Sequence, residues 1–276
     1  MSAPAFNYED FDEILYLGNG SFGTVSLYNE KTTKRLVAIK SMKKDHFRNP
    51  YGQQMLRREL EFHYHLKHEH IVGLYGFFYD AFMVHIVLEA CCPKNLARIL
   101  EIKKELTVPR ASYIADCIGS ALQFCHERLL IHRDVKPANI LFWEGWKPKL
   151  ADFGLCVQNS DGRRHTYCGT IDYAAPELAD PTEKRGHDYK VDVWSLGVVF
   201  YEMLEGRHPF KEMSNARKKE TVRTGILHGA VKGPLLAVND RKRIELSAFR
   251  ADQNFQKQVK MFHRRRLDSV KQGCNR

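Results

Sequence analysis

The chain has 276 residues, of which 43 % are apolar and 28 % are charged, and its formal net charge at pH 7 is +10. This length suits one two-lobed unit or two small domains, with enough apolar residues for a sizeable core. No run of about 18 apolar residues occurs, which excludes a membrane-spanning helix, and the first ten residues lack the basic and apolar regions of a secretory signal.

Seven cysteines are scattered along the chain, and no CxxC pair of the metal-binding type occurs. Their odd number and their spacing indicate reduced thiols in an intracellular protein. The positive net charge favours anionic partners such as a nucleotide, an acidic protein surface or nucleic acid. A surface rich in solvated lysine would explain the same charge without any partner.

The first ninety residues predict a small β-rich lobe that contains one helix. Short runs of β-branched and aromatic residues, typical of strands, occur at 14–17, 24–28, 36–41, 71–78 and 83–88. Between the third and fourth runs, helical spacing places on one face Met55, Glu59, Phe62, His63 and Leu66.

From Leu96 onward the helical period dominates, which predicts a larger helical lobe. An apolar stripe runs from Ala111 to Cys125, and residues 191–204 are apolar nearly all round, as in a helix buried on every side. The connector between the lobes is predicted at 89–94. The last residues, basic and weakly periodic from Lys257, are expected to form a tail or a marginal surface helix.

A glycine-rich run lies between the first two predicted strands: Gly18-Asn19-Gly20-Ser21-Phe22-Gly23-Thr24-Val25. Glycines let backbone N–H groups approach phosphate oxygens closely, because no Cβ intervenes. Since a strand follows rather than a helix, the run does not fit a dinucleotide site. A hairpin that merely contains glycines is the alternative interpretation of this run taken alone.

The third predicted strand ends at Lys40, which has a predicted partner in Glu59. Glu59 sits within the apolar face of the helix, where a carboxylate needs a cation to offset its desolvation. Lys40 is the natural cation, and the pair would hold the lysine against the α- and β-phosphates of a nucleotide. The alternative is that Glu59 lies at the edge of that face and is solvated.

A polar run follows the long amphipathic helix: His132-Arg133-Asp134-Val135-Lys136-Pro137-Ala138-Asn139. Asp134 can accept or orient a hydroxyl proton, Lys136 can neutralise a γ-phosphate, and Asn139 can ligate a hard cation through its oxygen. Asp152-Phe153-Gly154 then supplies a second ligand for that cation. Each motif alone could be an ordinary loop, but the ordered set is highly specific.

Together with Ala175-Pro176-Glu177, these motifs resemble the signature set of the protein kinases. The resemblance covers roughly residues 11–210 closely and extends loosely to about 255. Within the kinases the chain most resembles the Aurora family, and the stretches that carry this similarity are 56–61, 74–80, 163–170 and 190–198. The HRD-x-K-P form of the catalytic run is similar to serine/threonine rather than tyrosine kinases.

The resemblance implies a bilobal α+β fold, with an antiparallel sheet and one helix in the N-lobe and a mostly helical C-lobe. The implied segments of the chain are an extension at 1–10, a kinase domain at 11–255 and a basic tail at 256–276. Within the kinase domain, the N-lobe is expected at 11–88, the hinge at 89–94 and the C-lobe at 95–255.

The resemblance also implies two cofactors, ATP and Mg²⁺, and assigns residues to them. The metal ligands would be Asn139 and Asp152, and the catalytic set would be Asp134, Lys136, Lys40 and Glu59. Residues expected to contact ATP are Leu17, Gly18, Asn19, Gly20, Ser21, Phe22, Gly23, Val25, Ala38, Lys40, Leu88, Glu89, Cys91 and Leu141.

Regulation and substrate binding follow from the same resemblance. Thr166 is the implied activating phosphosite, and the side chains expected to bind its phosphate are Arg58, Arg133 and Arg164. Thr170 and Glu202 are expected on the peptide-binding side. The implied partners are protein substrates with serine or threonine acceptors and an activating partner on the N-lobe, with no membrane and no nucleic-acid site. The family implies the cytoplasm or nucleus, with spindle or chromosome association and a role in cell division.

Three departures from the Aurora pattern qualify these expectations. Ala138 replaces a glutamate that would bind a substrate arginine two residues before the acceptor, although Glu202, which can serve a similar role, is kept. The stretch 210–243 is shorter than in the family, and the N-terminal extension is nearly absent.

The alternative function is a catalytically weak pseudokinase, a nucleotide-binding scaffold, but all of the nucleotide and catalytic residues named above are present.

Overall fold

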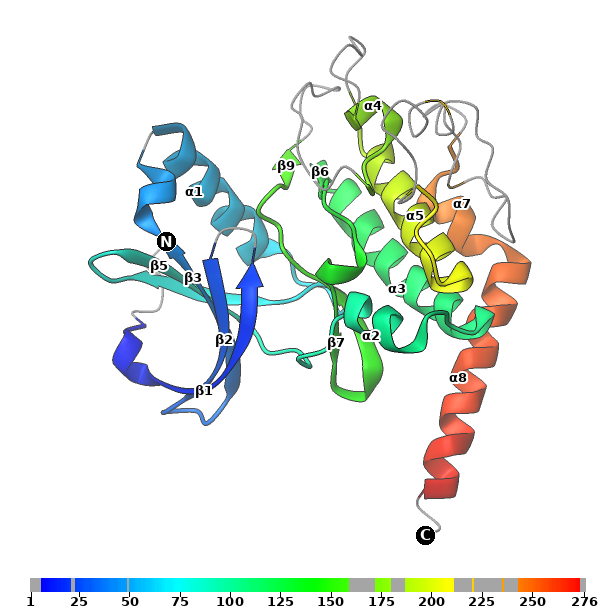
Figure 1. The fold of residues 1–276 in the computed structure, drawn as a ribbon, viewed down its shortest axis with the longest axis horizontal. Coiled ribbons are helices and arrows are strands. Elements are labelled where there is room, and N and C mark those ends of the chain that lie inside the picture. The colour runs from blue at the N-terminus through cyan, green and yellow to red at the C-terminus, as the bar shows by residue number, and fades with distance from the viewer. Residues whose placement is uncertain are drawn as a thin grey trace. The chain divides into compact units, whose positions relative to one another are not determined.

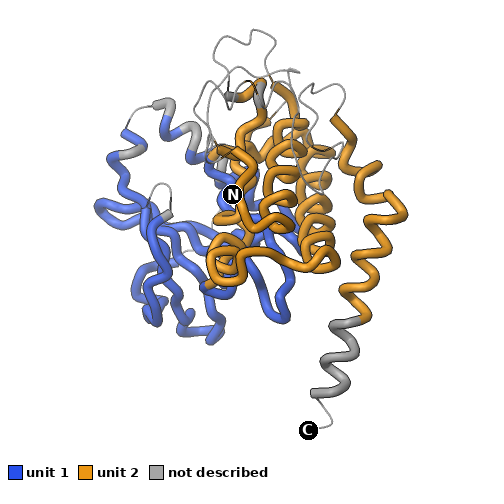
Figure 2. The backbone as a smooth tube through the Cα atoms, turned by 45° about the vertical axis from the view of Figure 1, so that its right-hand side comes forward, with its two compact units in different colours: residues 1–93, 141–154 blue, residues 94–140, 155–276 orange. Residues whose placement is uncertain are grey.

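The computed structural model describes residues 6–20, 23–48, 50–158, 172–179, 187–210, 220, 235 and 243–273. The chain divides into two compact units, drawn in different colours in Figure 2. Unit 1 comprises residues 1–93 and 141–154, and unit 2 comprises residues 94–140 and 155–276. The segment 141–154, which carries Asp152, therefore folds with the N-terminal part of the chain.

Unit 1 is built on a five-stranded antiparallel sheet in the order β1-β2-β3-β5-β4 (Figure 1). All five predicted strands are found, and with the helices described below they confirm the α+β fold class. The elements of the sheet and its flanks are η1 Tyr8–Asp10, β1 Phe11–Gly20, β2 Gly23–Glu30, β3 Leu36–Lys43, η2 Lys44–Phe47, α1 Pro50–His65, β4 Leu74–Tyr79 and β5 Met83–Glu89.

The fourth strand is shorter than the sequence predicted, because its first residues pair elsewhere. β4 begins at Leu74, whereas Ile71 forms an isolated parallel bridge with Leu150. The Val72 N–H donates to the Leu150 carbonyl at 2.9 Å. Leu150 ends β8, Lys147–Leu150, which forms a two-stranded sheet with β7, Ile140–Trp143, across the turn η4, Glu144–Trp146.

Lys40 lies on β3, the middle strand of the sheet, where Val37 to Lys40 are all buried. One apolar cluster contains Phe11, Tyr28, Val37, Ile39, Phe78 and Val87. A second cluster includes residues of α1 and contains Met42, Leu56, Leu60, Leu74, Val84 and Ile86. Because successive strand residues alternate between faces, Lys40 shares the face of Met42, on the side of α1. The sheet therefore places this lysine where the sequence predicted a partner on the helix.

The buried face of α1 differs from the predicted one. Leu56, Leu60 and His63, at helical spacing, are at most 7 % exposed, whereas Phe62 is only half-buried. Leu56 and Leu60 pack with residues of β4 and β5 in the second cluster, which fixes the rotation of the helix. The predicted face is therefore confirmed at His63 and Leu66 and half-buried at Phe62, but it omitted the two leucines. The side chains of Met55 and Glu59 lie outside the described residues.

Unit 2 is centred on α5, Lys190–Glu205, in which every residue from Val191 to Val199 is buried. This confirms the helix predicted to be buried on every side. α3, Val108–His126, packs beside α5 (Figure 1). The other described elements of unit 2 are α2 Leu96–Lys103, β6 Leu130–Ile131, η3 Pro137–Asn139, β9 Val157–Gln158, α4 Pro176–Ala179, α7 Leu246–Ala251 and α8 Gln253–Gly273.

The sequence allowed either a tail or a surface helix for the basic C-terminal segment, and the structure shows a helix. It forms α8, in which Phe255 and Val259 are buried, and the Phe262 ring stacks on Tyr113 of α3 with centroids 4.6 Å apart. The first turns of α8 are thus packed rather than loose, and the tail boundary expected at 256 falls inside this helix. None of the helices in the described part of the chain is both long and apolar enough to cross a membrane.

Candidate active site

The sequence-predicted site residues fall in both units, and each set has its own geometry. The glycine-rich run, Lys40, residues 89–93 of the predicted hinge and Asp152 belong to unit 1, whereas Asp134, Lys136 and Asn139 belong to unit 2. Each set is built by a different group of elements: the five-stranded sheet and the segment after β8 in unit 1, and the loop after β6 in unit 2.

The glycine-rich run joins β1 to β2, with Gly20 opposite Gly23 in the strand register. Gly18 has a φ of 143°, which disfavours any residue with a Cβ. A Cβ on Gly23 would lie 2.0 Å from the Ser41 carbonyl oxygen of β3. Two of the glycines are therefore required by the backbone itself, whatever the run binds. Ser21 and Phe22 lie outside the described residues.

Lys40 has a partner that the sequence did not assign to it. Its Nζ lies 2.9 Å from Oδ1 of Asp152, and the two side chains are only 8 % and 19 % exposed. Asp152 has a φ of 64°, so the backbone is turned sharply to bring its carboxylate to the lysine. Because the Glu59 side chain lies outside the described residues, the Lys40–Glu59 pair stays a prediction.

His63 of α1 supports the segment around Asp152. Its Nε2–H donates to the Val72 carbonyl at 2.7 Å, and its ring lies 4.7 Å from that of Phe153, which is 1 % exposed. A buried histidine is tolerated here because the hydrogen bond satisfies its ring nitrogen while the face of the ring packs on Phe153. The position of α1 and that of the Asp152 segment are thereby linked.

Several of the residues expected to contact ATP are apolar and at least half-buried. Ala38 on β3 is buried and lies opposite Leu88 on β5, while Leu17, Val25 and Leu141 are half-buried. These side chains are small or apolar, as a flat heterocycle requires. Burial raises the pKa of the nearby Cys91 thiol to about 12, so that this cysteine is a neutral thiol at physiological pH.

In unit 2 the predicted catalytic loop is fixed by Asp192, which the sequence analysis did not single out. Asp192 is fully buried in α5, and its carboxylate accepts from the backbone amides of His132 and Arg133 at 2.9 and 2.8 Å. The His126 Nε2–H donates to it at 2.9 Å. An aspartate inside an otherwise apolar helix was the available signal, because a buried carboxylate needs donors.

The ionisation of Asp192 matches this arrangement. Burial acts to raise the pKa of the carboxyl group, but the hydrogen bond and charge of His126, the charge of His132 and the Arg133 amide outweigh it, and the pKa lies below its usual value. The carboxylate is therefore ionised and holds the loop by charge-assisted hydrogen bonds. Arg133, with a φ of 66°, takes the strained turn that this anchoring imposes.

Asp134, Lys136 and Asn139 come together on the anchored loop. The Lys136 Nζ lies 2.8 Å from Oδ2 of Asp134, and the Asn139 amide donates at 2.8 Å to both Oδ2 and the backbone carbonyl of Asp134. Asp134 and Asn139 are 6 % and 7 % exposed. The three side chains are thus held in one orientation, in which the carboxylate can meet a hydroxyl group and the lysine can meet an anion.

The donor set also fits a divalent cation of the Mg²⁺ type. Hard cations prefer oxygen ligands, and the Asn139 amide uses its nitrogen on Asp134, which leaves its oxygen as the atom suited to a metal. The Asp152 carboxylate supplies oxygens of the same kind. Both predicted ligands therefore carry suitable atoms, one in each unit.

The residues expected on the peptide-binding side are partly described, and a buried arginine of unit 2 has a clear partner. The Tyr173 hydroxyl donates to Oε2 of Glu202 at 2.7 Å, and Arg243 forms a two-point ion pair with Glu177 at 2.7 and 3.2 Å. Ala138 is exposed and brings no charge to this region. The predicted residues Thr166, Arg164 and Thr170, the Arg58 side chain and most of the shortened stretch 210–243 lie outside the described residues.

The sequence profile of the protein kinase domain matches residues 11–268. The chain belongs to the protein kinase family. Its domain is 40 % identical over 215 residues to an Aurora kinase of Patiria pectinifera, a match that covers 77 % of this chain and 52 % of that protein. It is equally identical over 207 residues to the serine/threonine-protein kinase Aurora-1 of Arabidopsis thaliana, covering 75 % of this chain and 69 % of that protein.

The relatives place this kinase domain among the Aurora type, as the local resemblances implied. A third relative, Aurora kinase A-B of Xenopus laevis, is 40 % identical over 203 residues, which cover 74 % of this chain and 49 % of that protein. The chain thus spans about half the length of the animal relatives. The match to the family profile runs to residue 268, beyond the boundary predicted at 255 and into α8.

Proposed function

We propose that this protein is an active serine/threonine kinase that transfers the γ-phosphate of ATP to protein substrates. The observation that carries the proposal is the orientation of Asp134 by Lys136 and Asn139, at 2.8 Å each, on a loop anchored by Asp192. A scaffold that only bound nucleotide would not need a catalytic carboxylate held in this way.

In the proposed reaction the substrate hydroxyl oxygen attacks the γ-phosphorus of ATP. The new O–P bond forms as the bond to the β-phosphate oxygen breaks, ADP leaves, and the hydroxyl proton passes to Asp134. Lys136 and Lys40 stabilise phosphate charge, and the amides of the glycine-rich run cradle the phosphates. Mg²⁺, which Asp152 and Asn139 would hold, supplies further neutralisation of phosphate charge. Catalysis is then mainly positioning and electrostatics.

The relatives also support a role in cell division, with association to the spindle or chromosomes, because both are expected of Aurora-type kinases.

The alternative function is a pseudokinase scaffold, favoured by the exposed Ala138 and the short stretch 210–243. A transfer assay separates the two, since a pseudokinase binds nucleotide without phosphorylating a substrate.

Asp134→Asn is the direct test of the catalytic proposal. Because the amide cannot take the hydroxyl proton, phosphoryl transfer from radiolabelled ATP to a basic peptide should fall by about 100-fold or more, while nucleotide binding persists. The matched control is Glu127→Gln, an exposed carboxylate after α3, which should keep full activity. Undiminished transfer by purified Asp134→Asn protein would rule out the mechanism, and a wild-type protein that binds ATP without transfer would establish the scaffold.

The substrate preference should depend on Ala138. We expect weak selection for arginine two residues before the acceptor, because only Glu202 remains to bind it and Glu202 already accepts from Tyr173. Ala138→Glu should raise that selection about tenfold, since a hydrogen bond between charged groups contributes about 1.5–3 kcal/mol. A peptide array measures the effect, with Ala138→Gln as the uncharged control. Strong arginine selection by the wild type would contradict the expectation.

Thr166 is the proposed activating phosphosite, preceded by Arg163 and Arg164 in a sequence that the kinase itself could phosphorylate. A phosphate there would add about two negative charges, which Arg133 and neighbouring arginines would bind. Thr166→Ala should lower kcat/KM roughly tenfold, whereas Ser247→Ala, an exposed hydroxyl on α7, should not. Mass spectrometry of active protein should find the phosphate, and fully active unmodified protein would place the switch elsewhere.

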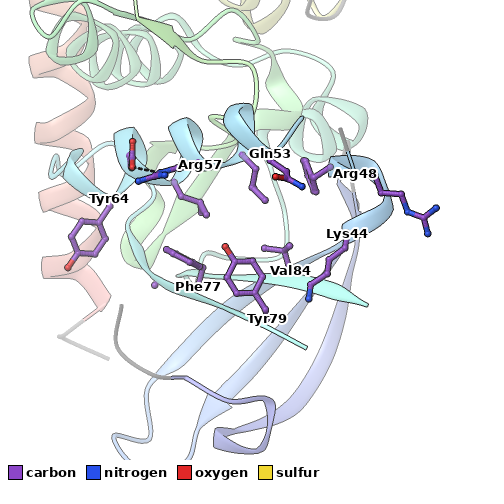
Figure 3. A pocket seen from close by; sticks show the side chains of 13 residues that line it. Lys44, Arg48, Gln53, Arg57, Tyr64, Phe77, Tyr79 and Val84 are labelled. Carbon is purple, nitrogen blue, oxygen red and sulfur yellow. Dashed lines mark hydrogen bonds and ion pairs between the residues drawn. The ribbon is translucent and has the colours of Figure 1, made fainter. Parts of the chain in front are cut away.

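An activating partner on unit 1 is supported by a pocket between α1 and the strands β4 and β5 (Figure 3). The pocket has a volume of about 790 Å³. Its apolar lining includes Leu56, Leu60, Phe77 and Val84. Lys44, Arg48 and Arg57 also line it, and Arg57 pairs at 3.0 Å with Glu61, a carboxylate of the same lining, so the lining carries an excess of positive charge. These features fit a peptide with aromatic anchors and acidic neighbours.

Fluorescence anisotropy with a synthetic peptide of that composition tests the partner site. Arg48→Glu reverses an exposed charge at the pocket and should weaken binding about tenfold or more. The control is Lys43→Glu, an exposed lysine of β3 that does not line the pocket and should bind normally. Equal binding by the two variants, or no binding by the wild type, would remove this proposal without affecting the catalytic one.

A further inference from the structure

The predicted hinge carries a buried ion pair that neither the proposed mechanism nor the family signature uses. The Lys149 Nζ on β8 lies 2.9 Å from Oε2 of Glu89, the last residue of β5. The two side chains are 8 % and 15 % exposed. Two charges removed from water to this extent are costly unless they are closely paired and further hydrogen-bonded.

Both ends of this ion pair are satisfied by the backbone of the segment before β4. The Gly73 N–H donates to Oε2 of Glu89 at 2.9 Å, and the Glu89 N–H donates back to the Gly73 carbonyl at 2.8 Å. The Lys149 ammonium donates to the Ile71 carbonyl at 3.2 Å. The residues 71–73 that the sequence predicted as strand are thus held between the hinge and β8.

The same segment is tied to β8 by the main chain. The Leu150 N–H donates to the His70 carbonyl at 2.8 Å, and the Val72 N–H donates to the Leu150 carbonyl at 2.9 Å. The Val72 carbonyl in turn accepts from His63 of α1. Lys149 therefore sits at a junction that joins α1, β8 and the end of β5.

Along the chain, each member of the ion pair is close to a part of unit 1 that would bind ATP. Glu89, whose backbone is expected at the adenine, lies between Leu88 and Cys91, which are also expected to contact ATP. Lys149 stands three residues before Asp152, whose carboxylate pairs with Lys40 at the expected phosphate end. A shift of β8 relative to the hinge would move the Asp152 carboxylate relative to the hinge backbone that is expected at the adenine.

A second lysine on the same strand shows that this burial is specific to Lys149. Lys147 pairs with Glu69 at 3.5 Å, and their side chains are 36 % and 63 % exposed. A solvent-accessible pair at this distance contributes little to stability. The strand thus offers a buried lysine, Lys149, and a half-buried lysine, Lys147, two residues apart, and the two serve as matched test positions.

We propose that Lys149 is a positioning residue for the nucleotide: its ion pair with Glu89 fixes the hinge backbone relative to the strand that carries Asp152. The inference rests on the proposed kinase function, since it presumes that ATP binds along unit 1. Lys149 does not touch the nucleotide in this scheme. It acts through Glu89 on the backbone that would meet the adenine and through β8 on the segment of Asp152.

The test is a comparison of nucleotide binding by Lys149→Met, Lys149→Arg and Lys147→Met. Isothermal titration with MgADP should give a Kd raised about tenfold for Lys149→Met and unchanged for Lys147→Met, with Lys149→Arg recovering most of the loss because it keeps the charge. In the transfer assay the KM for ATP should rise by the same factor as the Kd, while kcat stays within about twofold. This is the pattern expected when a variant loses binding energy that the ground state and the transition state share equally.

A folding defect is separated from a positioning defect by two further measurements. The double variant Lys149→Met/Glu89→Leu leaves no unpaired buried charge, so it should fold, yet it should still bind MgADP about tenfold more weakly. Thermal unfolding without nucleotide records the stability of each variant. If Lys149→Met or the double variant is destabilised but binds MgADP as the wild type does, the pair is structural only and the inference is wrong.

Tighter MgADP binding or faster transfer by these variants would also overturn the inference, because the pair would then restrain the site rather than support it. A wild-type protein that binds no MgADP at all would instead remove the proposed function. The failure of the inference and the failure of the function it rests on are therefore different results.

Discussion

The buried carboxylate of Asp192 is the interaction on which the candidate catalytic loop depends. It lies at the start of α5, a helix buried on nearly every side, and accepts from two consecutive backbone amides of the loop and from His126. A buried anion cannot be left without donors, so the loop backbone has one favourable position. The strained φ of Arg133 follows from this anchoring, and Asp134 is presented by it.

Unit 1 uses buried charge in the same way, but between strands rather than between a helix and a loop. Lys40 on β3 is held by Asp152, and Lys149 on β8 is held by Glu89 on β5. Each pair joins residues far apart in sequence. In the first pair the backbone of Asp152 has a positive φ, and in the second Glu89 and Gly73 also exchange two hydrogen bonds. Removing one partner of such a pair would leave an uncompensated buried charge, so each pair favours the arrangement in which its two residues meet.

The sequence predicted the five strands, the helix α3 and the buried helix α5 because periodicity and β-branched composition are local properties. It was less successful where a tertiary contact decided the outcome. The rotation of α1 depends on how Leu56 and Leu60 pack against β4 and β5, and the start of β4 depends on the bridge between Ile71 and Leu150. Neither contact leaves a periodic signal in the segment that it changes.

The sequence by itself determined the kind of chemistry, since the order of the glycine-rich run, Lys40, Asp134, Asn139 and Asp152 is a property of residue types and spacing. Only the tertiary structure decided which groups meet: Asp152 as the partner of Lys40, Asp192 as the anchor of the loop, and Lys149 as the partner of Glu89. The physical reason is that a motif fixes which atoms are available, whereas desolvation fixes which of them must pair. Desolvation depends on the whole surrounding fold.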